Sequence, residues 1–311
     1  MATKKRKGLW LLAIGVVAVA AAVTFQTATA DTATGGSGKQ ADGPGIITVE
    51  QLNMCMWGSK ETKDCFPNAN DPSDPAWADT ERHTAELKRD SMVTQYQRHT
   101  PDVITVNEGC LNDLRTVADK LGYQLRYQET GGGADGKPRE CTVDRGAGVN
   151  AILAKKFSGD GPQGYFESKG HRSYICAQVS TSEWSSVRVC TAHLSLAQQG
   201  DHQKTECGIL RDQILGKSTG YVVFAGDLNM KGANQNCAPS SFHGLHDLAR
   251  PGTPSIPQDG LQHIYYSANG FWRQSCGWAY TVEHTDHRGF LLELGKSAPS
   301  DPGDCWRDIR Q

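Results

Sequence analysis

The chain has 311 residues, of which 38% are hydrophobic and 21% are charged, and its formal net charge is −2 at pH 7. This is the composition of a globular protein, so collagen-like and wholly disordered classes are excluded. No run of Lys and Arg follows residue 30, which disfavours a protein that binds nucleic acid through a basic face alone.

The first 30 residues have the pattern of a secretory signal peptide. Residues 4–7 are Lys-Lys-Arg-Lys, residues 8–23 are apolar, and residues 28–30 form an Ala-Thr-Ala cleavage site. The alternative is an uncleaved membrane anchor, but the apolar run is a little short for a span of about 20 residues. We therefore predict a secreted protein, with a membrane-anchored form as the alternative. Cleavage after Ala30 would leave 28 basic and 34 acidic side chains, a formal charge of −6.

Ten cysteines follow the signal peptide, an even number that indicates disulfides in an exported protein. Residues 174–190 predict a hairpin with its turn near Ser182 and Glu183. Cys176 and Cys190 are equidistant from that turn, so they should face each other at a distance that a disulfide bridges. The simplest full scheme joins neighbours, and only its hairpin pair has a geometric argument: Cys55–Cys65, Cys110–Cys141, Cys176–Cys190, Cys207–Cys237 and Cys276–Cys305. A zinc site is the alternative, without a CxxC or a close Cys/His cluster to support it.

The rest of the chain alternates between strand and helix patterns. Residues 31–45 are rich in Gly, Ser, Thr and Ala and are typical of a flexible leader. Apolar alternation predicts strands at 46–54, 101–109, 123–130, 146–155, 221–230, 261–267 and 289–295, besides the hairpin. Helical spacing predicts helices at 80–99, 111–122 and 202–216. We expect one α/β domain over 46–295 with mixed sheets, and a C-terminal tail over 296–311.

Polar side chains close five of these segments. They are Asn53, Glu108, His193, the pair Asp227 and Asn229, and the pair Asp286 and His287. Taken singly, each is explained by a turn, a solvated strand end or a packed histidine. Five strand ends of this kind are improbable by chance, and polar groups at strand ends commonly build a site on a rigid scaffold.

The residue types indicate chemistry at a hard metal ion. Carboxylate and carboxamide oxygens are the ligands preferred by Mg²⁺, Mn²⁺ or Ca²⁺. Two histidines beside such an ion suit the hydrolysis of a phosphate ester, because charge on the phosphoryl oxygens must be stabilised and a water must be oriented for attack.

Seven motifs, in this order, resemble the endonuclease/exonuclease/phosphatase superfamily. This superfamily includes pancreatic-type deoxyribonucleases, abasic-site endonucleases, neutral sphingomyelinases and inositol polyphosphate 5-phosphatases. The motifs are "QLNMCMW", "PDVITVNEG", "GAGVNAILAK", "VCTAHLS", "FAGDLNM", "LQHIYYS" and "TDHRGF". "GDLN" and "TDHR" are the specific ones, and together the seven cover residues 46 to about 295.

The resemblance implies a four-layer α/β sandwich, in which two mixed β-sheets pack face to face with helices outside. It further implies that Asn53 and Glu108 hold a divalent metal, Mg²⁺ or else Mn²⁺ or Ca²⁺. Asp227 would position or activate the attacking water, and Asn229 would bind the phosphate. The site would lie at one edge of the two sheets.

The resemblance gives roles to the remaining candidates as well. His193 would donate to the phosphoryl or leaving oxygen. His287 would act as base or phosphate polariser, with Asp286 orienting its ring; which group takes the proton is left open. The match departs at Gln262, where the family usually has Asp, and a neutral amide cannot supply a carboxylate's charge. The neighbouring His263 should point to the opposite face of its strand.

These observations predict a secreted, metal-dependent phosphodiesterase that acts on a nucleic acid or a phospholipid head group, with a nuclease favoured and no stable protein partner inferred. Candidate nucleic-acid contacts are Arg139, Arg145, Arg172, Trp184, Arg188, Lys231 and Trp272. A sphingomyelinase- or phospholipase-like enzyme would instead use Trp184, Phe271 and Trp272 at the lipid surface. A catalytically weak binding or toxin-like module is a further alternative, supported only by Gln262.

Overall fold

A computed structural model describes residues 45–56, 77–131, 138–168, 171–231, 235–247, 254–273 and 277–297. The predicted signal peptide lies outside these residues, as do most of the leader and most of the C-terminal tail. Within the described ranges, no helix is both long and apolar enough to cross a bilayer.

The first sheet has seven strands and contains the N-terminal and C-terminal strands of the fold. Its path runs β11-β13-β1-β2-β4-β3, and β12 also pairs with β13. Strands β1 and β2 are parallel, whereas the other pairs are antiparallel. The strands are β1 (Ile47–Asn53), β2 (Val103–Cys110), β3 (Gln124–Glu129), β4 (Gly148–Ala154), β11 (Trp272–Arg273), β12 (Trp278–Thr281) and β13 (Arg288–Gly295).

The second sheet has six strands in the order β5-β6-β7-β8-β10-β9. Strands β7 and β8 are parallel and the other pairs are antiparallel, so this sheet is mixed as well. The strands are β5 (Phe157–Tyr165), β6 (Ser173–Val179), β7 (Val187–Ala192), β8 (Val222–Asp227), β9 (Phe242–His246) and β10 (Gln262–Ser267).

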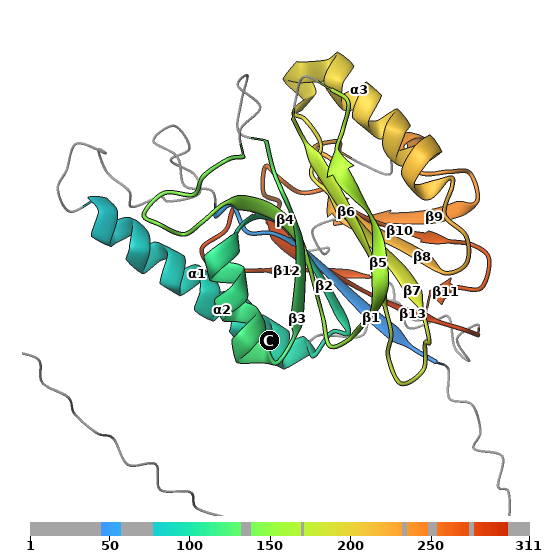
Figure 1. Cartoon of the computed structure of the whole chain (residues 1–311), viewed down its shortest axis with the longest axis horizontal. Helices are drawn as coiled ribbons and strands as arrows, with labels where there is room; N and C mark the ends of the chain where they lie inside the picture. The colour runs from blue at the N-terminus through green and yellow to red at the C-terminus, as the bar shows by residue number, and fades with distance from the viewer. Residues whose placement is uncertain are drawn as a thin grey trace, which may run out of the picture. The chain divides into compact units, whose positions relative to one another are not determined.

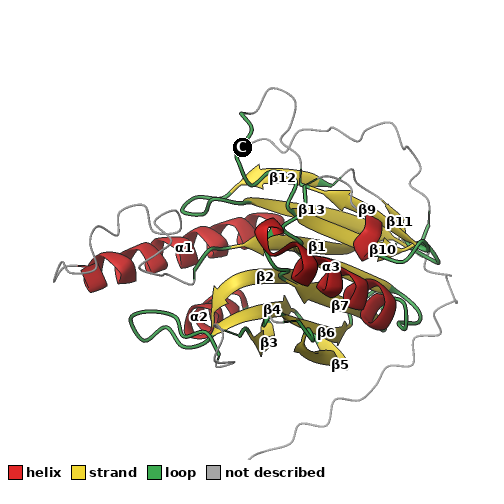
Figure 2. Cartoon of the chain, turned by 90° about the horizontal axis from the view of Figure 1, so that it is seen from above, coloured by secondary structure: helices red, strands yellow, loops and turns green. Residues whose placement is uncertain are grey.

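Helices cover the outer faces of both sheets (Figures 1 and 2). Helices α1 (Trp77–His99) and α2 (Leu111–Leu121) share an apolar cluster with the first sheet. Helix α3 (Gly200–Ile209) continues as a π-helical segment (Leu210–Leu215) and shares a cluster with the second sheet. A third cluster, drawn from the inner faces of both sheets, fills the space between them. The predicted four-layer sandwich is therefore confirmed.

The structure adds four strands that the apolar pattern did not predict: β5, β9, β11 and β12. Strand β5 has the sequence FSGDGPQGY, whose glycines and proline hide any alternation, and it forms an edge strand with register shifts. Strands β11 and β12 are two and four residues long, too short to show a period. The predicted helix at 202–216 begins at Gly200 and changes to π-helical geometry at Leu210.

Three of the five expected disulfides are formed: Cys110–Cys141, Cys176–Cys190 and Cys207–Cys237. The register places Cys176 directly opposite Cys190 in the β6–β7 hairpin, as the turn position predicted. The other two expected pairs include Cys65, Cys276 and Cys305, which lie outside the described residues.

The aromatic residues expected at a lipid surface are mostly packed inside the fold. Trp184 is 1% exposed and its ring contacts those of Tyr221 and Phe271, at centroid distances of 4.6 and 5.0 Å. Phe271 is buried too, and only Trp272 is largely exposed. The expectation that Trp184 and Phe271 enter a membrane is therefore wrong, as is the expectation that Trp184 contacts nucleic acid, because both side chains are buried in the core between the sheets.

Arg145 is a buried structural residue, so its interpretation as a nucleic-acid contact is wrong. Its guanidinium donates to Glu81 Oε1 at 2.7 Å, to Asp113 Oδ2 at 3.2 Å and to the carbonyl of Met56 at 2.8 Å. These bonds tie the loop before β4 to both α1 and α2. A buried charge is tolerated only when it is paired in this way.

Replacing Arg145 by Met should lower the free energy of unfolding by about 3–5 kcal/mol, because buried Glu81 loses the cation that pairs with it and buried Asp113 is left with Arg89. Urea denaturation measures the loss. Arg211→Met is the matched control, since Arg211 pairs with Asp212 on the exposed surface, and it should leave the unfolding midpoint nearly unchanged. Equal midpoints for the two variants would contradict the structural role of Arg145.

Candidate active site

The parallel pairing of β7 and β8 sets two of the predicted site residues side by side. His193 follows β7 and forms an isolated parallel bridge with Asp227, the last residue of β8. Gly226 permits this approach, because a Cβ there would lie 2.3 Å from the carbonyl oxygen of Ala192. The glycine of "GDLN" is therefore required by the contact between the strands.

Asp227 is fully buried and hydrogen-bonded through both carboxylate oxygens. Oδ2 accepts from Asn53 Nδ2 at 2.9 Å, and Oδ1 accepts from the backbone N–H of Asn229 at 2.8 Å. Burial alone would raise the pKa of Asp227, but His193, His287 and these two hydrogen bonds together hold that pKa below its ordinary value. Asp227 is therefore a carboxylate at neutral pH.

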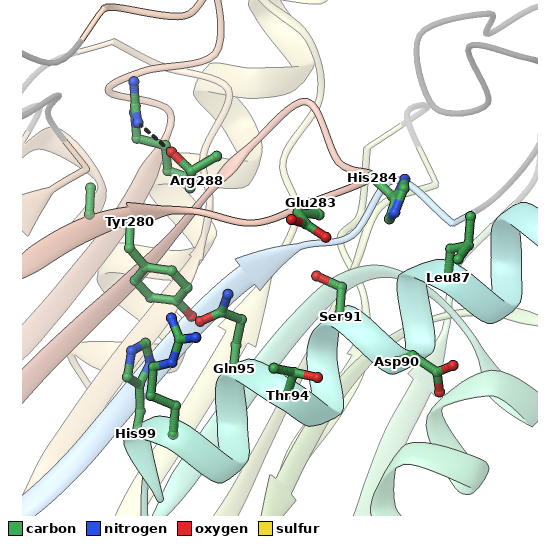
Figure 3. Close-up of a pocket in the computed structure, with 13 residues that line it drawn as sticks. Leu87, Asp90, Ser91, Thr94, Gln95, His99, Tyr280, Glu283, His284 and Arg288 are labelled. Carbon is green, nitrogen blue, oxygen red and sulfur yellow. Dashed lines mark hydrogen bonds between the residues drawn. The ribbon is translucent and has the colours of Figure 1, made fainter. Parts of the chain in front are cut away.

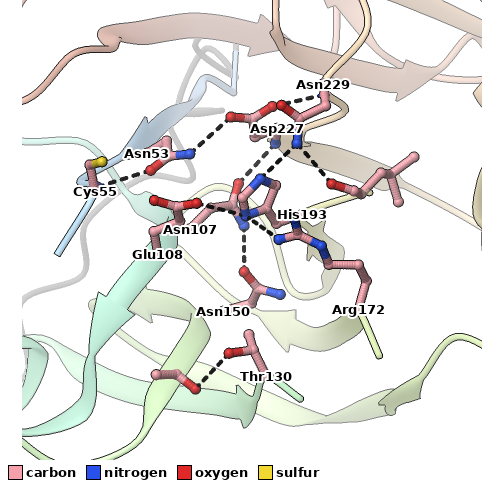
Figure 4. Close-up of polar contacts among 12 residues, drawn as sticks. Asn53, Cys55, Asn107, Glu108, Thr130, Asn150, Arg172, His193, Asp227 and Asn229 are labelled. Atoms are coloured by element: carbon pink, nitrogen blue, oxygen red, sulfur yellow. Dashed lines mark hydrogen bonds and ion pairs between the residues drawn. The ribbon is translucent and has the colours of Figure 1, made fainter. Parts of the chain in front are cut away.

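His193 is buried between an amide and a guanidinium (Figure 4). Its Nε2 lies 2.8 Å from Asn229 Nδ2, and its Nδ1 lies 3.1 Å from Arg172 Nη1 and 3.5 Å from Glu108 Oε1. Burial and the positive charge of Arg172 lower the pKa of His193 well below its usual value. The imidazole is therefore neutral, with one N–H to donate.

Asn229 is held in a left-handed backbone conformation with φ of 53°. Its Nδ2 also donates to the carbonyl of Leu194, and its own carbonyl accepts from Gln203 Nε2 at 2.9 Å. These bonds stabilise a conformation that a non-glycine residue seldom adopts. The amide is fixed beside the ring of His193; its predicted contact with phosphate stays a prediction.

Asn53 ends β1 and Glu108 lies near the end of the neighbouring strand β2, and the two side chains lie close together (Figure 4). Burial raises the pKa of Glu108, Arg172 and His287 lower it in part, and the charges of Asp227 and Asp286 raise it again. Three carboxylates thus oppose one another's ionisation, which a bound cation would relieve.

This oxygen-rich donor set fits a divalent cation such as Mg²⁺. Within the described part of the chain, no three His, Cys, Asp or Glu side chains are grouped to hold a metal. Mg²⁺ needs no such group, because it commonly keeps several waters and binds one or two carboxylates. Glu108, the amide oxygen of Asn53 and Asp286 are the residues here that would hold it.

Asp286 and His287 come from the loop before β13 and complete the site. His287 Nε2 lies 3.7 Å from both Asp227 Oδ2 and Asp286 Oδ1, longer than a hydrogen bond but within reach of an electrostatic contact. Asp286 Oδ2 accepts from Gln258 Nε2 at 3.2 Å. The structure therefore brings together all seven residues that the sequence singled out.

Gln262, the departure from the family pattern, forms its side-chain hydrogen bonds with residues other than His287. Its Oε1 accepts from the backbone N–H of Asn53 at 2.8 Å, and its Nε2 donates to the carbonyl of Arg288. His287 Nδ1 is buried and has no hydrogen-bond partner among the described residues. His263, next in the strand, is packed: its Nε2 lies 2.8 Å from the carbonyl of Met230, and burial lowers its pKa to about 4.

Several residues that support the site were missed or undervalued in the sequence. Asn107 and Asn150 lie beneath it and are fully buried. Arg172 reaches His193 from the turn before β6, and Lys88 of α1 donates to the carbonyls of Met54 and Cys55. Amides inside apolar strands, as in "ITVNEG" and "GVNAILA", are the signal that could have revealed the first two.

The two sheets and the helices outside them define a four-layer α/β sandwich, and comparison with solved structures identifies its fold. The human Nocturnin catalytic domain, with bound sulfate, matches with a TM-score of 0.57 and 15% identity over 82% of this chain and 96% of that one. D. rerio TDP2 matches with a TM-score of 0.56 and 14% identity, over 80% of this chain and 99% of that one. An endonuclease/exonuclease/phosphatase protein from Beutenbergia cavernae matches with a TM-score of 0.52 and 18% identity, over 81% of this chain and 72% of that one.

The chain therefore has the fold of the endonuclease/exonuclease/phosphatase superfamily. No protein-family model matches the sequence, and a sequence search of curated proteins finds no match. At identities of 14–18% the likeness concerns the fold, and the chemistry must be argued from the residues of the site.

Asp247 gives a test of how the site is supported. Its Oδ1 accepts from the backbone N–H groups of Gln262 and Gly260, at 2.8 and 3.1 Å. Burial raises its pKa from 3.8 to about 8 in the folded protein. Between these two values the unfolded chain releases the proton that the folded chain keeps, so this group lowers the stability of the fold as pH rises.

Asp247→Asn keeps the accepting oxygen and removes the titration. The variant should therefore gain stability relative to the parent as pH rises from 4.5 to 8, with a difference of about 2–4 °C in Tm for each kcal/mol. Thermal unfolding of both proteins at the two pH values measures this. Parallel pH profiles for the two proteins would show that Asp247 does not titrate in this window.

Proposed function

We propose that the mature chain is an exported, divalent-metal-dependent phosphodiesterase whose substrate is a nucleic acid. The observation that carries the proposal is the convergence of one ionised carboxylate, one neutral imidazole and a second histidine on a space lined by oxygen ligands. Export is supported by the N-terminal pattern and by the three disulfides, which persist in oxidising compartments.

Asp227 is the group best suited to orient the attacking water and accept its proton. It stays ionised at neutral pH and its two oxygens are fixed by Asn53 and Asn229. Each oxygen has a further lone pair for the water. His287 Nε2, 3.7 Å away, faces the same space and can polarise the phosphoryl group.

His193 and Arg172 stand on the other side of this space. Asn229 Nδ2 donates to Nε2 of the neutral His193 ring, so the ring carries its one N–H on Nδ1, beside Arg172 and Glu108, and can donate it from there to a phosphoryl or leaving oxygen. Arg172 adds a fixed positive charge beside it, where charge develops on the phosphoryl oxygens. A divalent cation, when bound, would neutralise charge on the same oxygens.

A nucleic acid is the preferred substrate on two grounds. The aromatic residues that a lipid enzyme would insert into a membrane are largely buried in this chain. Among the structural neighbours, D. rerio TDP2 was solved as a complex with a single-strand DNA product, and ANGEL2, at 14% identity, is a 2′,3′-cyclic phosphatase.

The substrate and the metal can be tested together with purified mature protein. Single-stranded DNA, RNA, plasmid DNA and sphingomyelin vesicles are incubated with Mg²⁺, Mn²⁺ or Ca²⁺, with and without EDTA. We expect cleavage of nucleic acid, its loss in EDTA and its recovery when excess metal is added back. Release of phosphocholine from sphingomyelin without cleavage of nucleic acid would overturn the substrate class, and full activity in EDTA would overturn the metal dependence.

Asp227→Ala and His287→Ala should each reduce kcat by about 10²–10⁴-fold, because each removes a group that acts on the water or the phosphoryl oxygen. Asp227→Asn, which keeps the shape of the side chain, should be similarly impaired. Asp212→Asn and His243→Ala change exposed residues and serve as matched controls. Circular dichroism checks that each variant is folded. Near-parental turnover by folded Asp227→Ala and His287→Ala would refute the site assignment.

A further inference from the structure

Two pockets meet at Arg288 of β13, and they differ in chemistry. The larger, about 570 Å³, lies between α1 and the residues around β12, and its lining is mostly polar (Figure 3). The smaller, about 380 Å³, is lined by Ile256, Pro257 and Val282 and also by Asp286 and His287. An apolar pocket therefore opens directly onto the catalytic histidine, and its volume lies in the range usual for small-molecule sites.

The apolar wall of the smaller pocket is a fixed part of the structure. Arg288 Nε donates to Asp259 Oδ1 and its Nη2 donates to the carbonyl of Pro254, both at 2.6 Å. The backbone N–H of Ile256 donates to Asp259 Oδ2 at 2.8 Å. One buried arginine thus anchors both ends of the segment 254–259, because its guanidinium presents several donors in a rigid plane.

The wall is also connected to the catalytic pair. Gln258, which belongs to the same segment, donates to Asp286 Oδ2 at 3.2 Å. A ligand in the pocket would therefore contact the wall and lie beside His287 at the same time. A group covalently attached to a phosphate bound at His287 would be within reach of this pocket.

We propose that this pocket receives the base of a nucleotide adjoining the scissile phosphate, an inference that rests on the proposed phosphodiesterase function. Ile256, Pro257 and Val282 offer apolar surface against which a planar base can pack. The amide of Gln258 at the edge can hydrogen-bond to the edge of a base. A long acyl chain suits the pocket poorly, because its lining includes the polar side chains of Gln258, Asp286 and Arg288.

The test compares substrates that differ only in one base. The dinucleotide TpT is compared with the two analogues in which either nucleoside is replaced by a base-free tetrahydrofuran residue. Loss of the base that occupies the pocket should lower kcat/KM by about 10-fold or more, and loss of the other base should matter less. Ile256→Asp should lower kcat/KM for TpT to the level of the poorer analogue and leave that analogue almost unaffected.

Two further variants separate recognition from folding. Ile256→Ala removes apolar surface without adding a charge and should give a smaller loss of the same kind. Ile46→Ala, which changes an exposed apolar residue at the opposite end of β1 from Asn53, should leave the ratio of the two substrates unchanged. If Ile256→Asp lowers kcat/KM equally for TpT and for both analogues, the pocket is not a base site. The same conclusion follows if no Ile256 variant changes the ratio of kcat/KM between TpT and the poorer analogue.

A binding measurement distinguishes failure of this inference from failure of the proposed function. Calorimetry compares thymidine 5′-monophosphate with deoxyribose 5-phosphate on the parent protein and on Ile256→Asp. Base-dependent binding that Ile256→Asp abolishes supports the pocket even if no substrate is cleaved. Cleavage without any dependence on the base overturns the pocket and leaves the phosphodiesterase standing. If the protein shows no cleavage and no base-dependent binding, both the pocket and the proposed function are overturned.

Discussion

The site depends on one buried side chain, the amide of Asn107, which joins the two sheets beneath it. Its Oδ1 accepts from Gln51 Nε2 of β1 and from the backbone N–H of Asp227 of β8, both at 2.8 Å. Its Nδ2 donates to Asn150 Oδ1 of β4 at 2.9 Å and to Thr191 Oγ1 of β7 at 3.2 Å. All four hydrogen-bonding positions of the amide are thus occupied. Since an unsatisfied polar group would be costly at this depth, the network specifies how the sheets are aligned.

The alignment explains why the site tolerates unusual backbone conformations. Glu108 and Asn229 both have φ of 53°, in the left-handed region that non-glycine residues seldom occupy. Glu108 directly follows Asn107, and Asn229 lies two residues after Asp227, whose backbone N–H donates to Asn107. The strands are fixed at that point, so the next side chains can be directed into the site at a cost that the surrounding bonds offset. The positions of the Glu108 carboxylate and of the Asn229 amide beside His193 follow from the same constraint.

Much of this could be predicted from the sequence, and the reason is the regularity of strands. A strand that ends in a polar residue places it at a sheet edge, which is how Asn53, Glu108, His193 and Asp227 were found. The four-layer sandwich came from the resemblance of the motifs and their order.

What could not be predicted depends on contacts between distant parts of the chain. The partners of Asn107 come from four different strands, and no local pattern encodes them. Arg172 looked like any surface arginine, because only the fold shows that the turn before β6 reaches His193. Arg145 looked the same and is instead locked between two helices. Residues of one type in similar loops thus acquire opposite roles through their three-dimensional neighbours.

Gln262 shows why a departure from a family pattern has to be interpreted in its own surroundings. Its amide accepts from Asn53 of β1 and donates to Arg288 of β13, so it bonds across two strands at once. A carboxylate could accept the first bond, but when ionised it has no proton to donate in the second. The glutamine is therefore suited to holding the edge of the first sheet against β10.

This arrangement affects His287, because its buried Nδ1 has no hydrogen bond to Gln262. The orientation of that ring must come from elsewhere, and the structure offers two sources. One is the pair of carboxylates facing Nε2, Asp227 and Asp286. The other is the segment 254–259, which is anchored by Arg288 and hydrogen-bonded to Asp286 through Gln258. Because the same segment lines the apolar pocket, a ligand packed against it would also restrict the ring of His287, and binding in the pocket would then be coupled to the orientation of that ring.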